Sequence, residues 1–333
     1  MSHVPELVCP AGTPAALREA VDAGADSVYC GLQNATNARN FPGLNFSLED
    51  LRANVVYAHA HGAKVLLAVN TFAIAGKTGL WRDAIDAGVE LGVDAIIVAD
   101  IGVATYAART HPQQRLHLSV QASASSPEAI GYYCREFGVK RVVLPRILTV
   151  GEITQIASEI PCELETFIFG NHGLMLEGRC SLTNYVTGQS TNMDGVCSPA
   201  AQVRFEPGAD GAVTSRLGEL VIDCFGQGDN AGYPTICKGR YLAPCRTDPY
   251  YAFEEPVSLN LAAMLGDLIK AGVHAFKIEG RQRSRAYVKA VVSAFRRAID
   301  TVIRGGDPDV GELLALTEGQ KQTAGAFKSK NWR

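Results

Sequence analysis

Hydrophobic residues recur along the chain in short runs rich in Val, Ile and Leu, and segments with helical spacing separate most of these runs. A run that is apolar on both faces is typical of a buried parallel strand. Eight such strands are predicted, at residues 4–10, 26–32, 63–70, 94–100, 115–123, 140–146, 162–170 and 274–280. The intervening amphipathic segments predict helices, for example at Pro14–Ala23, Leu51–Ala60, Trp81–Leu91 and Ala129–Phe137.

A glycine joins predicted helix to predicted strand at five places, namely residues 23–29, 61–67, 91–97, 137–143 and 271–277. Such a glycine ends a helix in the left-handed conformation, and the β-branched run after it begins the next strand. Eight strands alternating with helices predict an α/β fold with a (β/α)8 TIM-barrel-like domain. A doubly wound open sheet is the alternative, but no G-x-G-x-x-G motif follows the first strand.

The interval 171–257 breaks this alternation, because it is rich in Gly, Pro, Asn and Thr and lacks the repeated unit. We therefore predict a barrel from residues 1–170 plus 258–305, an inserted segment at 171–257 and a C-terminal tail at 306–333. A helix from Ser284 to about Val302 is expected to close the barrel. The insertion follows the seventh strand, so it should leave from the face where barrel enzymes keep their chemistry.

Composition restricts the class of protein. The chain has 333 residues, 47% hydrophobic and 20% charged, which fits a globular protein with a large core. Its net charge is −3 and it has no long basic run, which disfavours nucleic acid as the main partner. The sequence shows no secretory signal and no apolar run that could span a membrane, and the nine cysteines are too sparse for a disulfide scaffold. We expect a cytoplasmic protein with reduced thiols.

The inserted segment holds five of the nine cysteines, namely Cys180, Cys197, Cys224, Cys237 and Cys245. Their spacing differs from the close pairs of a zinc finger, and suits an iron–sulfur site assembled from separate loops. Inert buried cysteines are the alternative, because free cysteine is often a core residue.

Polar residues mark the carboxyl ends of the predicted strands, namely Asn70, Asp100, Gln121, Ser123, Arg146, Glu165 and Glu279. In a barrel these ends meet at one mouth, where they would line a substrate pocket. Each could instead cap the helix that follows it. Arg39 lies in a polar loop, residues 36–46, which follows the second strand and reaches the same mouth, where it could act as a lid.

The eighth strand carries the strongest signal. Lys277 and Glu279 alternate onto one face, toward the lumen, as a candidate proton-transfer pair. They could also simply neutralise each other there. Arg281 and Arg283 then precede a helix that Ser284 can cap, which predicts an anion site for carboxylate or phosphate. The alternative is a solvated basic turn.

Several motifs together resemble those of the collagenase-like peptidase family U32. They are Asn37–Phe46, Val120–Ser123, Val143–Arg146, Glu165–Gly170, Glu177–Cys180, Cys197–Ala200, Asn230–Tyr241, Glu254–Asn260 and Lys277–Ser284, and they cover nearly the whole chain. The resemblance implies an O2-independent hydroxylase subunit of ubiquinone biosynthesis, with a 4Fe-4S cluster and a prephenate-like hydroxyl donor. It also implies a heterodimer with a UbiV-like homologue and a UbiT-like lipid-carrier protein as accessory.

Members of this family also hydroxylate RNA bases, so an RNA base hydroxylase is an alternative. Proteolysis is not expected, because neither G-x-S-x-G nor H-E-x-x-H is present. Lys277 and Glu279 are the candidate catalytic residues. The residues expected to bind substrate or donor are Arg39, Asn70, Gln121, Arg146, Arg281 and Arg283.

The resemblance supplies three cluster ligands, Cys180, Cys197 and Cys237, which should converge near the mouth within a few ångströms of one another. The fourth family position, seven residues before Cys180, is Gly173, which offers no side chain to iron. His172 is our preferred substitute, since imidazole binds iron. Cys245, Cys224 or an open iron site are alternatives, and without a cluster the chain would be a scaffold subunit of the same complex.

Overall fold

The computed structural model describes residues 4–172, 180–188, 197–229, 231–317 and 321–330. Eight parallel strands form a barrel that closes because the last of them pairs with both the first and the seventh. They are β1 (Glu6–Pro10), β2 (Ser27–Gly31), β3 (Lys64–Val69), β4 (Ala95–Val98), β5 (Leu116–Leu118), β6 (Arg141–Val143), β7 (Glu163–Asn171) and β14 (Val273–Ile278). The predicted (β/α)8 fold is therefore confirmed, and all eight predicted strands are present.

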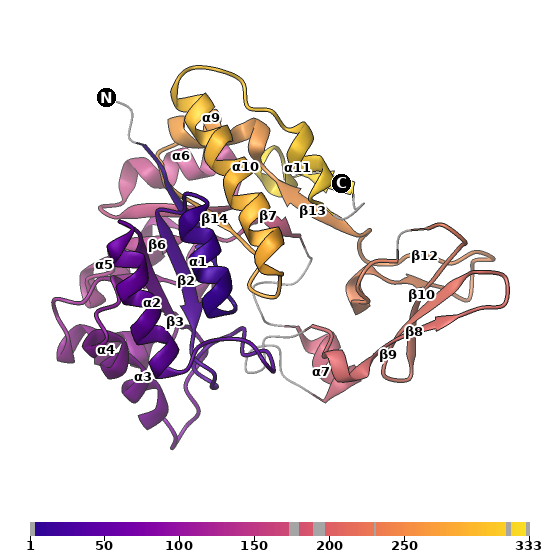
Figure 1. Ribbon diagram of the computed structural model, residues 1–333, viewed down its shortest axis with the longest axis horizontal. Coiled ribbons are helices and arrows are strands. Elements are labelled where there is room, and N and C mark those ends of the chain that lie inside the picture. The colour runs from indigo at the N-terminus through magenta and orange to yellow at the C-terminus, as the bar shows by residue number, and fades with distance from the viewer. Residues whose placement is uncertain (1–3, 173–179, 189–196, 230, 318–320, 331–333) are drawn as a thin grey trace.

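Helices surround the barrel (Figure 1), namely α1 (Pro14–Asp22), α2 (Leu48–Ala60), α3 (Gly79–Glu90), α4 (Ile101–Thr110), α5 (Pro127–Phe137), α6 (Val150–Glu159), α9 (Leu265–Lys270) and α10 (Arg285–Ile303). Side chains that accept a backbone N–H begin several of them. Ser284 accepts from Tyr287 N at the start of α10, as the sequence predicted. Asp100 accepts from Val103 N and caps α4, so its strand-end position serves helix formation.

The main hydrophobic core lies between the barrel and its helices, and its largest fully buried side chains include Trp81, Phe46, Phe169, Phe276 and Phe295. The barrel interior is different. A small apolar group occupies part of it, namely Val8, Tyr29, Leu66, Ala95, Ile97 and Ala275. Charged side chains from the strands take up further buried positions, namely Arg141, Glu165 and Lys277.

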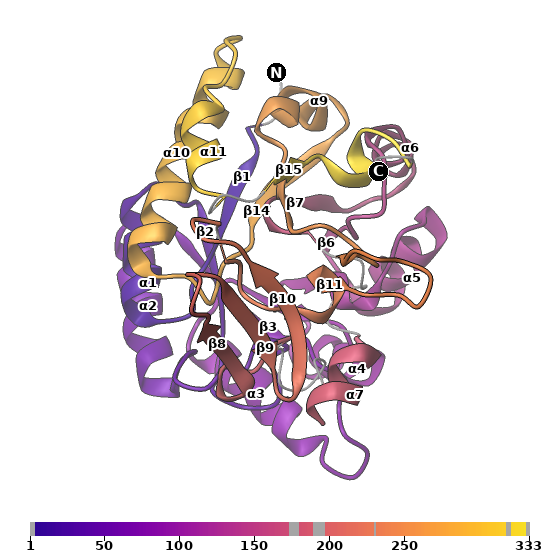
Figure 2. The same ribbon diagram turned by 90° about the vertical axis from the view of Figure 1, so that its right-hand side faces the viewer.

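The insertion after β7 lies beyond one end of the barrel and across that end when seen along the axis (Figures 1 and 2). It contains α7 (Ser181–Thr187), a three-stranded antiparallel sheet of β8 (Val203–Pro207), β9 (Val213–Leu217) and β10 (Leu220–Phe225), and the pair β11 (Arg240–Tyr241) and β12 (Tyr250–Tyr251). Its own core is small, built on Leu217, Ile222 and Ile236. Its organisation therefore depends largely on strand pairing.

The insertion returns through β13 (Val257–Asn260), which runs antiparallel to the end of β7. The residues predicted as a tail add α11 (Gly311–Ala315) and β15 (Lys321–Thr323), and β15 pairs with β13. Phe327 is almost fully buried in the main hydrophobic core, so the tail packs against the barrel.

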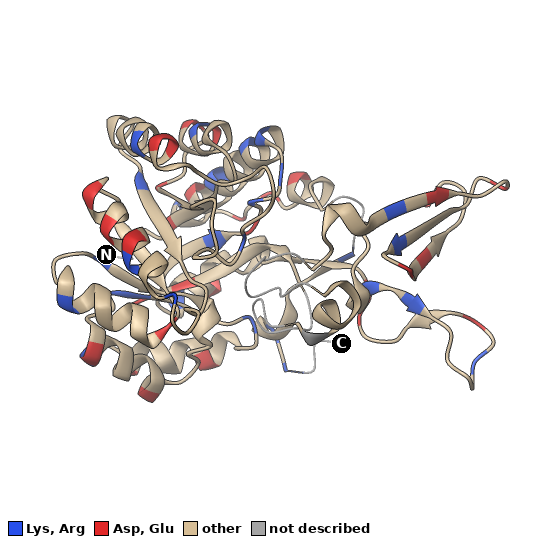
Figure 3. Ribbon diagram, turned by 90° about the horizontal axis from the view of Figure 1, so that it is seen from below, with Lys and Arg blue, Asp and Glu red and all other residues tan. Residues whose placement is uncertain are grey.

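Basic and acidic positions are interspersed along the outer helices and the insertion (Figure 3). Within the described ranges, no helix has both the length and the apolarity that a bilayer crossing requires.

Candidate functional site at the barrel mouth

Glu279, directly after β14, receives two arginines at the barrel mouth. Arg146 donates from Nη2 to Glu279 Oε2 at 2.7 Å, and Arg39 Nη2 lies 3.7 Å from Glu279 Oε1. The Arg146 guanidinium also stacks on the Phe167 ring, with its central carbon 3.8 Å from the ring centroid. Two cations share one carboxylate here, so the group retains an excess positive charge that suits an anionic ligand.

Arg281 is buried beside this group. Its Nη1 donates to Asn37 Oδ1 at 2.8 Å, and its guanidinium carbon lies 5.6 Å from the centroid of the Tyr29 ring. Burial, together with the charge of Arg39, lowers the pKa of Arg281 to about 10. Arg281 therefore remains a cation near neutral pH and adds a third positive charge to the mouth.

The backbone of Gly31 lies close to the side chain of Asn37, and this packing supports the contact of Asn37 with Arg281. A Cβ atom on Gly31 would stand 2.3 Å from Asn37 Cγ, so only glycine leaves room for the amide that accepts from Arg281. Asn70 holds the same loop, because its Oδ1 accepts from Ala38 N at 3.0 Å. The loop that carries Arg39 is thus fixed from two neighbouring strands.

The other two predicted binding residues occupy different positions. Gln121 is buried in the short 3-10 turn Val120–Ala122 that follows β5. Arg283 is exposed and stacks on Tyr287 of α10, 5.2 Å from its ring centroid. The structure therefore buries Arg281 beside the mouth, whereas Arg283 is exposed where α10 begins.

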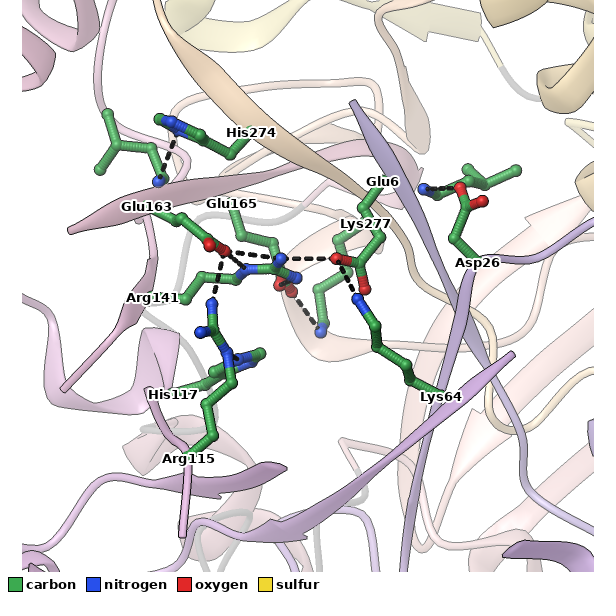
Figure 4. Close-up of polar contacts among 12 residues, drawn as sticks. Glu6, Asp26, Lys64, Arg115, His117, Arg141, Glu163, Glu165, His274 and Lys277 are labelled. Carbon is green, nitrogen blue, oxygen red and sulfur yellow. Dashed lines mark hydrogen bonds and ion pairs between the residues drawn. The ribbon is translucent and has the colours of Figure 1, made fainter. Parts of the chain in front are cut away.

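Lys277 points into the barrel and bonds Glu165, as Figure 4 shows. Its Nζ donates to Glu165 Oε1 at 2.6 Å and lies 3.8 Å from the centroid of the Tyr29 ring. Burial lowers the pKa of Lys277, and the charge of Glu165 opposes this shift. Lys277 is thus neutralised by Glu165 while Glu279 is held by arginines, and the two predicted catalytic residues do not neutralise each other.

A wider ion network extends from Glu165 toward the N-terminal ends of the barrel strands (Figure 4). Arg141 is its centre and contacts Glu6 at 2.6 Å, Glu163 at 2.8 Å and Glu165 at 3.4 Å. Lys64, Arg115 and His117 complete it. Burial and the charge of Arg141 hold the pKa of His117 well below its usual value, so its imidazole is neutral. The sequence analysis missed this network, although polar residues interrupting apolar strands were a signal for it.

The three cysteines of the proposed cluster lie near the same mouth. Cys180 precedes α7, and its Sγ accepts from both the backbone N and the hydroxyl of Thr183 at 3.5 Å. Although Cys197 is exposed as a residue, burial of its thiol raises the pKa of that group, and the charges of Arg39, Cys180 and Glu279 also act on it. Burial likewise raises the pKa of Cys237, with Cys197 among its charged neighbours. Cys197 is thus within electrostatic reach of Cys180 and Cys237, but among the described residues the three thiols are not gathered as closely as the sequence predicted for cluster ligands.

These thiols carry the donor chemistry that an iron–sulfur cluster needs, since thiolates bind iron and N–H···S bonds stabilise them. Across the described ranges, no three His, Cys, Asp or Glu side chains are already grouped as a metal site. Gly173 and Glu177–Arg179 lie outside the described residues. Cys224 contacts the Thr214 hydroxyl on the insertion's sheet, and Cys245 is exposed.

His172, the preferred fourth ligand, is buried at the end of β7 and packs on Gly325, where an added Cβ would stand 2.7 Å from its ring. Burial lowers the pKa of His172 to about 4, and the charges of Arg146 and Lys238 act in the same direction. The imidazole is therefore neutral near pH 7, which is the form that binds metals.

Lys238 is a buried site residue that the sequence analysis did not select. Burial lowers its pKa, while the charges of Glu254, Cys237 and Glu279 oppose that shift. It follows Cys237 directly and its Nζ donates to Val257 O at 3.0 Å. Lys238 thus lies within electrostatic reach of Cys237, Glu254 and Glu279.

The model of peptidase family U32 matches residues 12–331 of the chain. The tRNA hydroxylation protein P1 of Bacillus subtilis is 32% identical over 296 residues, which are 89% of this chain and 63% of that protein. The tRNA hydroxylation protein P of Escherichia coli is 30% identical over 331 residues, with 95% of this chain and 72% of that protein covered.

The 23S rRNA 5-hydroxycytidine C2501 synthase of Escherichia coli is 29% identical over 96% of this chain and 42% of its own length. This chain therefore spans between about two fifths and three quarters of the length of these relatives. Among solved structures, the U32 peptidase Mk0906 superposes with a TM-score of 0.51 at 14% identity, covering 85% of this chain and 96% of that one. That likeness supports the barrel fold.

Proposed function

The chain belongs to peptidase family U32, and we propose that it acts there as a subunit of an oxygen-independent hydroxylase. One observation carries this proposal: Arg39 and Arg146 converge on Glu279 at the barrel mouth, with Arg281 buried beside them. An arginine-lined mouth suits an anionic donor, and Cys180, Cys197 and Cys237 supply the thiols that a redox cluster would need. The names of the relatives, which refer to hydroxylation of tRNA and rRNA, support the reaction class.

We assign the donor site to Arg39, Arg146 and Arg281. A prephenate-like donor carries two carboxylates, and planar guanidinium groups bind a carboxylate through two parallel hydrogen bonds. Glu279 holds Arg146 and Arg39 in place in the absence of the donor. Lys277 lies below them as the candidate proton donor or acceptor, with its charge balanced by Glu165.

A 4Fe-4S cluster would be held by Cys180, Cys197 and Cys237, with His172 as the proposed fourth ligand. When bound, such a cluster supplies one-electron redox chemistry beside the donor site. The Thr183 N–H bond to Cys180 Sγ would stabilise the thiolate in that role. Arg39, Arg146 and Arg281 would bind and orient the donor.

We propose a ubiquinone precursor as the acceptor, which makes the chain UbiU-like. A UbiV-like homologue would complete the heterodimer, and a UbiT-like carrier would deliver the lipid substrate. The net charge of −3 and the interspersed charges in Figure 3 support this choice over RNA, which selects for a basic field. The names of the relatives favour the second candidate, hydroxylation of an RNA base.

The cluster is tested by anaerobic purification with an iron count and a visible absorption spectrum. Replacing Cys180, Cys197 or Cys237 with Ser should remove most of the bound iron. The matched control Cys224→Ser, on the insertion's sheet, should retain it. Full iron content in all three variants would refute the assignment, and unchanged iron in His172→Ala would exclude that ligand.

The substrate is tested in a strain of the native host that lacks this gene, grown without oxygen. Mass spectrometry of quinones and of digested RNA should show loss of ubiquinone with RNA hydroxylation intact. The opposite pattern would establish the RNA alternative. Arg281→Lys keeps the charge but loses the planar fork, so it should reduce ubiquinone, whereas Arg109→Lys on the exposed outer surface should not.

A further inference from the structure

We propose that Tyr29 is a positioning residue, which holds Arg281 in place to receive one of the two carboxylates of the donor. The phenol ring contacts two cations, because Lys277 Nζ lies 3.8 Å and the Arg281 guanidinium carbon 5.6 Å from its centroid. Tyr29 is 6% exposed and belongs to β2, which β1 separates from β14. The inference rests on the proposed function, since it concerns how that donor is selected.

The Tyr29 side chain is itself fixed through its hydroxyl. Its Oη donates to Ile278 O at 2.9 Å, a bond that connects β2 to the end of β14. Burial raises the pKa of Tyr29 well above its ordinary value, so the phenol keeps its proton near pH 7. A protonated phenol adds no negative charge. The ring therefore orients the two cations without neutralising them.

The two cations differ in how their charges are balanced. Lys277 donates to Glu165 Oε1 at 2.6 Å, so a carboxylate compensates it. Among the described residues, the contacts of Arg281 are with neutral groups, namely the Asn37 amide oxygen at 2.8 Å and the Tyr29 ring. A buried charge is unfavourable unless hydrogen bonds or an opposite charge compensate it. Arg281, which is 7% exposed, thus retains a charge that an anion can neutralise.

The backbone at Arg281 is fixed as well. A Cβ atom on Gly12 would stand 1.8 Å from Arg281 O, so the chain that follows β1 packs directly on it. Gly12 O in turn accepts from Asn45 N at 2.7 Å, in the loop that carries Arg39. Arg281 therefore occupies its position before a ligand arrives, which lowers the ordering cost of binding.

The mouth thus offers two subsites for carboxylates. The first is the pair Arg39 and Arg146, which Glu279 engages in the absence of a donor. The second is Arg281. A ligand with one carboxylate can use one subsite, whereas a ligand with two can use both. Tyr29 determines specificity because it keeps the second subsite in place.

Calorimetry with prephenate, which carries two carboxylates, and phenylpyruvate, which carries one, tests the inference. The wild-type protein should bind prephenate more tightly. Tyr29→Leu removes the ring, so it should weaken prephenate binding about tenfold and phenylpyruvate binding less than about twofold. Tyr29→Phe keeps the ring and should retain most of the preference. The matched control Tyr57→Leu removes the ring that lies 5.0 Å from the Arg18 guanidinium carbon on the outer helices, and should change neither affinity.

A second variant tests the charge of Arg281 while keeping the ring. Asn37→Asp places a carboxylate where the amide oxygen now accepts from Arg281, so it should neutralise Arg281 and remove the preference for prephenate. Circular dichroism checks that each variant folds, and Asn37→Asp decides the matter if Tyr29→Leu does not. A preference retained in Asn37→Asp, or an equal loss of both ligands in Tyr29→Leu, would overturn the inference.

The titrations need neither a cluster nor an acceptor, so they separate this inference from the proposed function. A protein that shows the expected preferences but hydroxylates neither quinone nor RNA would refute the proposed function and support the inference. A hydroxylase whose preference is the same in wild type and in Tyr29→Leu would overturn the inference alone. Equal affinity of the wild-type protein for both ligands would also overturn it.

Discussion

Arg141 is the most consequential buried cation of the barrel interior. Its side chain is 5% exposed and reaches three carboxylates, those of Glu6, Glu163 and Glu165. Arg141→Leu removes the charge and all three contacts while keeping an apolar side chain. Among the residues that the structure describes, Glu165, whose side chain is 1% exposed, would then retain Lys277 alone as an ionic partner.

The expected cost follows from burial. Removing one member of a buried ion pair costs about 3–5 kcal/mol, because the remaining charge stays away from water. The contact to Glu163 adds little, since that side chain is 34% exposed and water screens it. We therefore expect Arg141→Leu to lower the free energy of unfolding by about 3–5 kcal/mol.

Urea unfolding monitored by circular dichroism measures this loss. Arg115→Leu is the matched control, because Arg115 also contacts Glu163 but is 37% exposed, and it should cost about 1 kcal/mol or less. A loss below about 1 kcal/mol for Arg141→Leu, or one no larger than the control's, would refute the reasoning.

The pH dependence gives a second measurement. Despite its partial burial, the charges of Arg141 and Arg115 hold the pKa of Glu163 below its ordinary value. A carboxylate with a lowered pKa stabilises the fold above its unfolded pKa, and this contribution is lost as pH falls through the folded pKa. The deficit of Arg141→Leu should accordingly be largest near neutral pH and shrink below about pH 4. A deficit that is constant with pH would contradict an electrostatic origin.

Three further outcomes follow from single contacts. Ser284→Ala removes the cap of α10 and should cost about 1 kcal/mol in the free energy of unfolding, measured by urea titration. His117 has a folded pKa far below its unfolded value, so its stability contribution falls as pH drops below about 6.5. His117→Gln should flatten that slope between pH 7 and 5. Gly31→Ala displaces Asn37 from Arg281 and should weaken binding of a prephenate-like donor about tenfold in calorimetry, a change of about 1.4 kcal/mol, whereas Gly79→Ala, which meets no atom within 4 Å, should not.

The strands were predictable because parallel strands covered on both faces are continuous apolar runs. The residues at which the strands end were harder to predict. The fifth run was predicted at 115–123, but β5 ends at Leu118 because Ser119 accepts from Gln121 N and starts a 3-10 turn. A local side-chain contact thus decided a boundary that hydrophobicity alone did not define.

The position of the candidate site could be predicted from the sequence, but the partner that each charged side chain contacts could not. Arg146 and Glu279 follow strands, so their meeting at the mouth follows from the parallel barrel. The partner of Lys277 depends on the register of β14 against β7, which puts Glu165 within reach from 112 positions away. Arg281 and Arg283 look equivalent in sequence, and only the turn between β14 and α10 decides which one is buried.

The strand pair β7 and β13 places Asn171 directly opposite Ser258. The whole insertion therefore departs from the barrel and rejoins it at a single point. A segment attached in this way can be lengthened, shortened or exchanged over generations without altering the register of the eight barrel strands. The barrel would then be the inherited part, and the insertion a replaceable module through which related chains acquire different substrates.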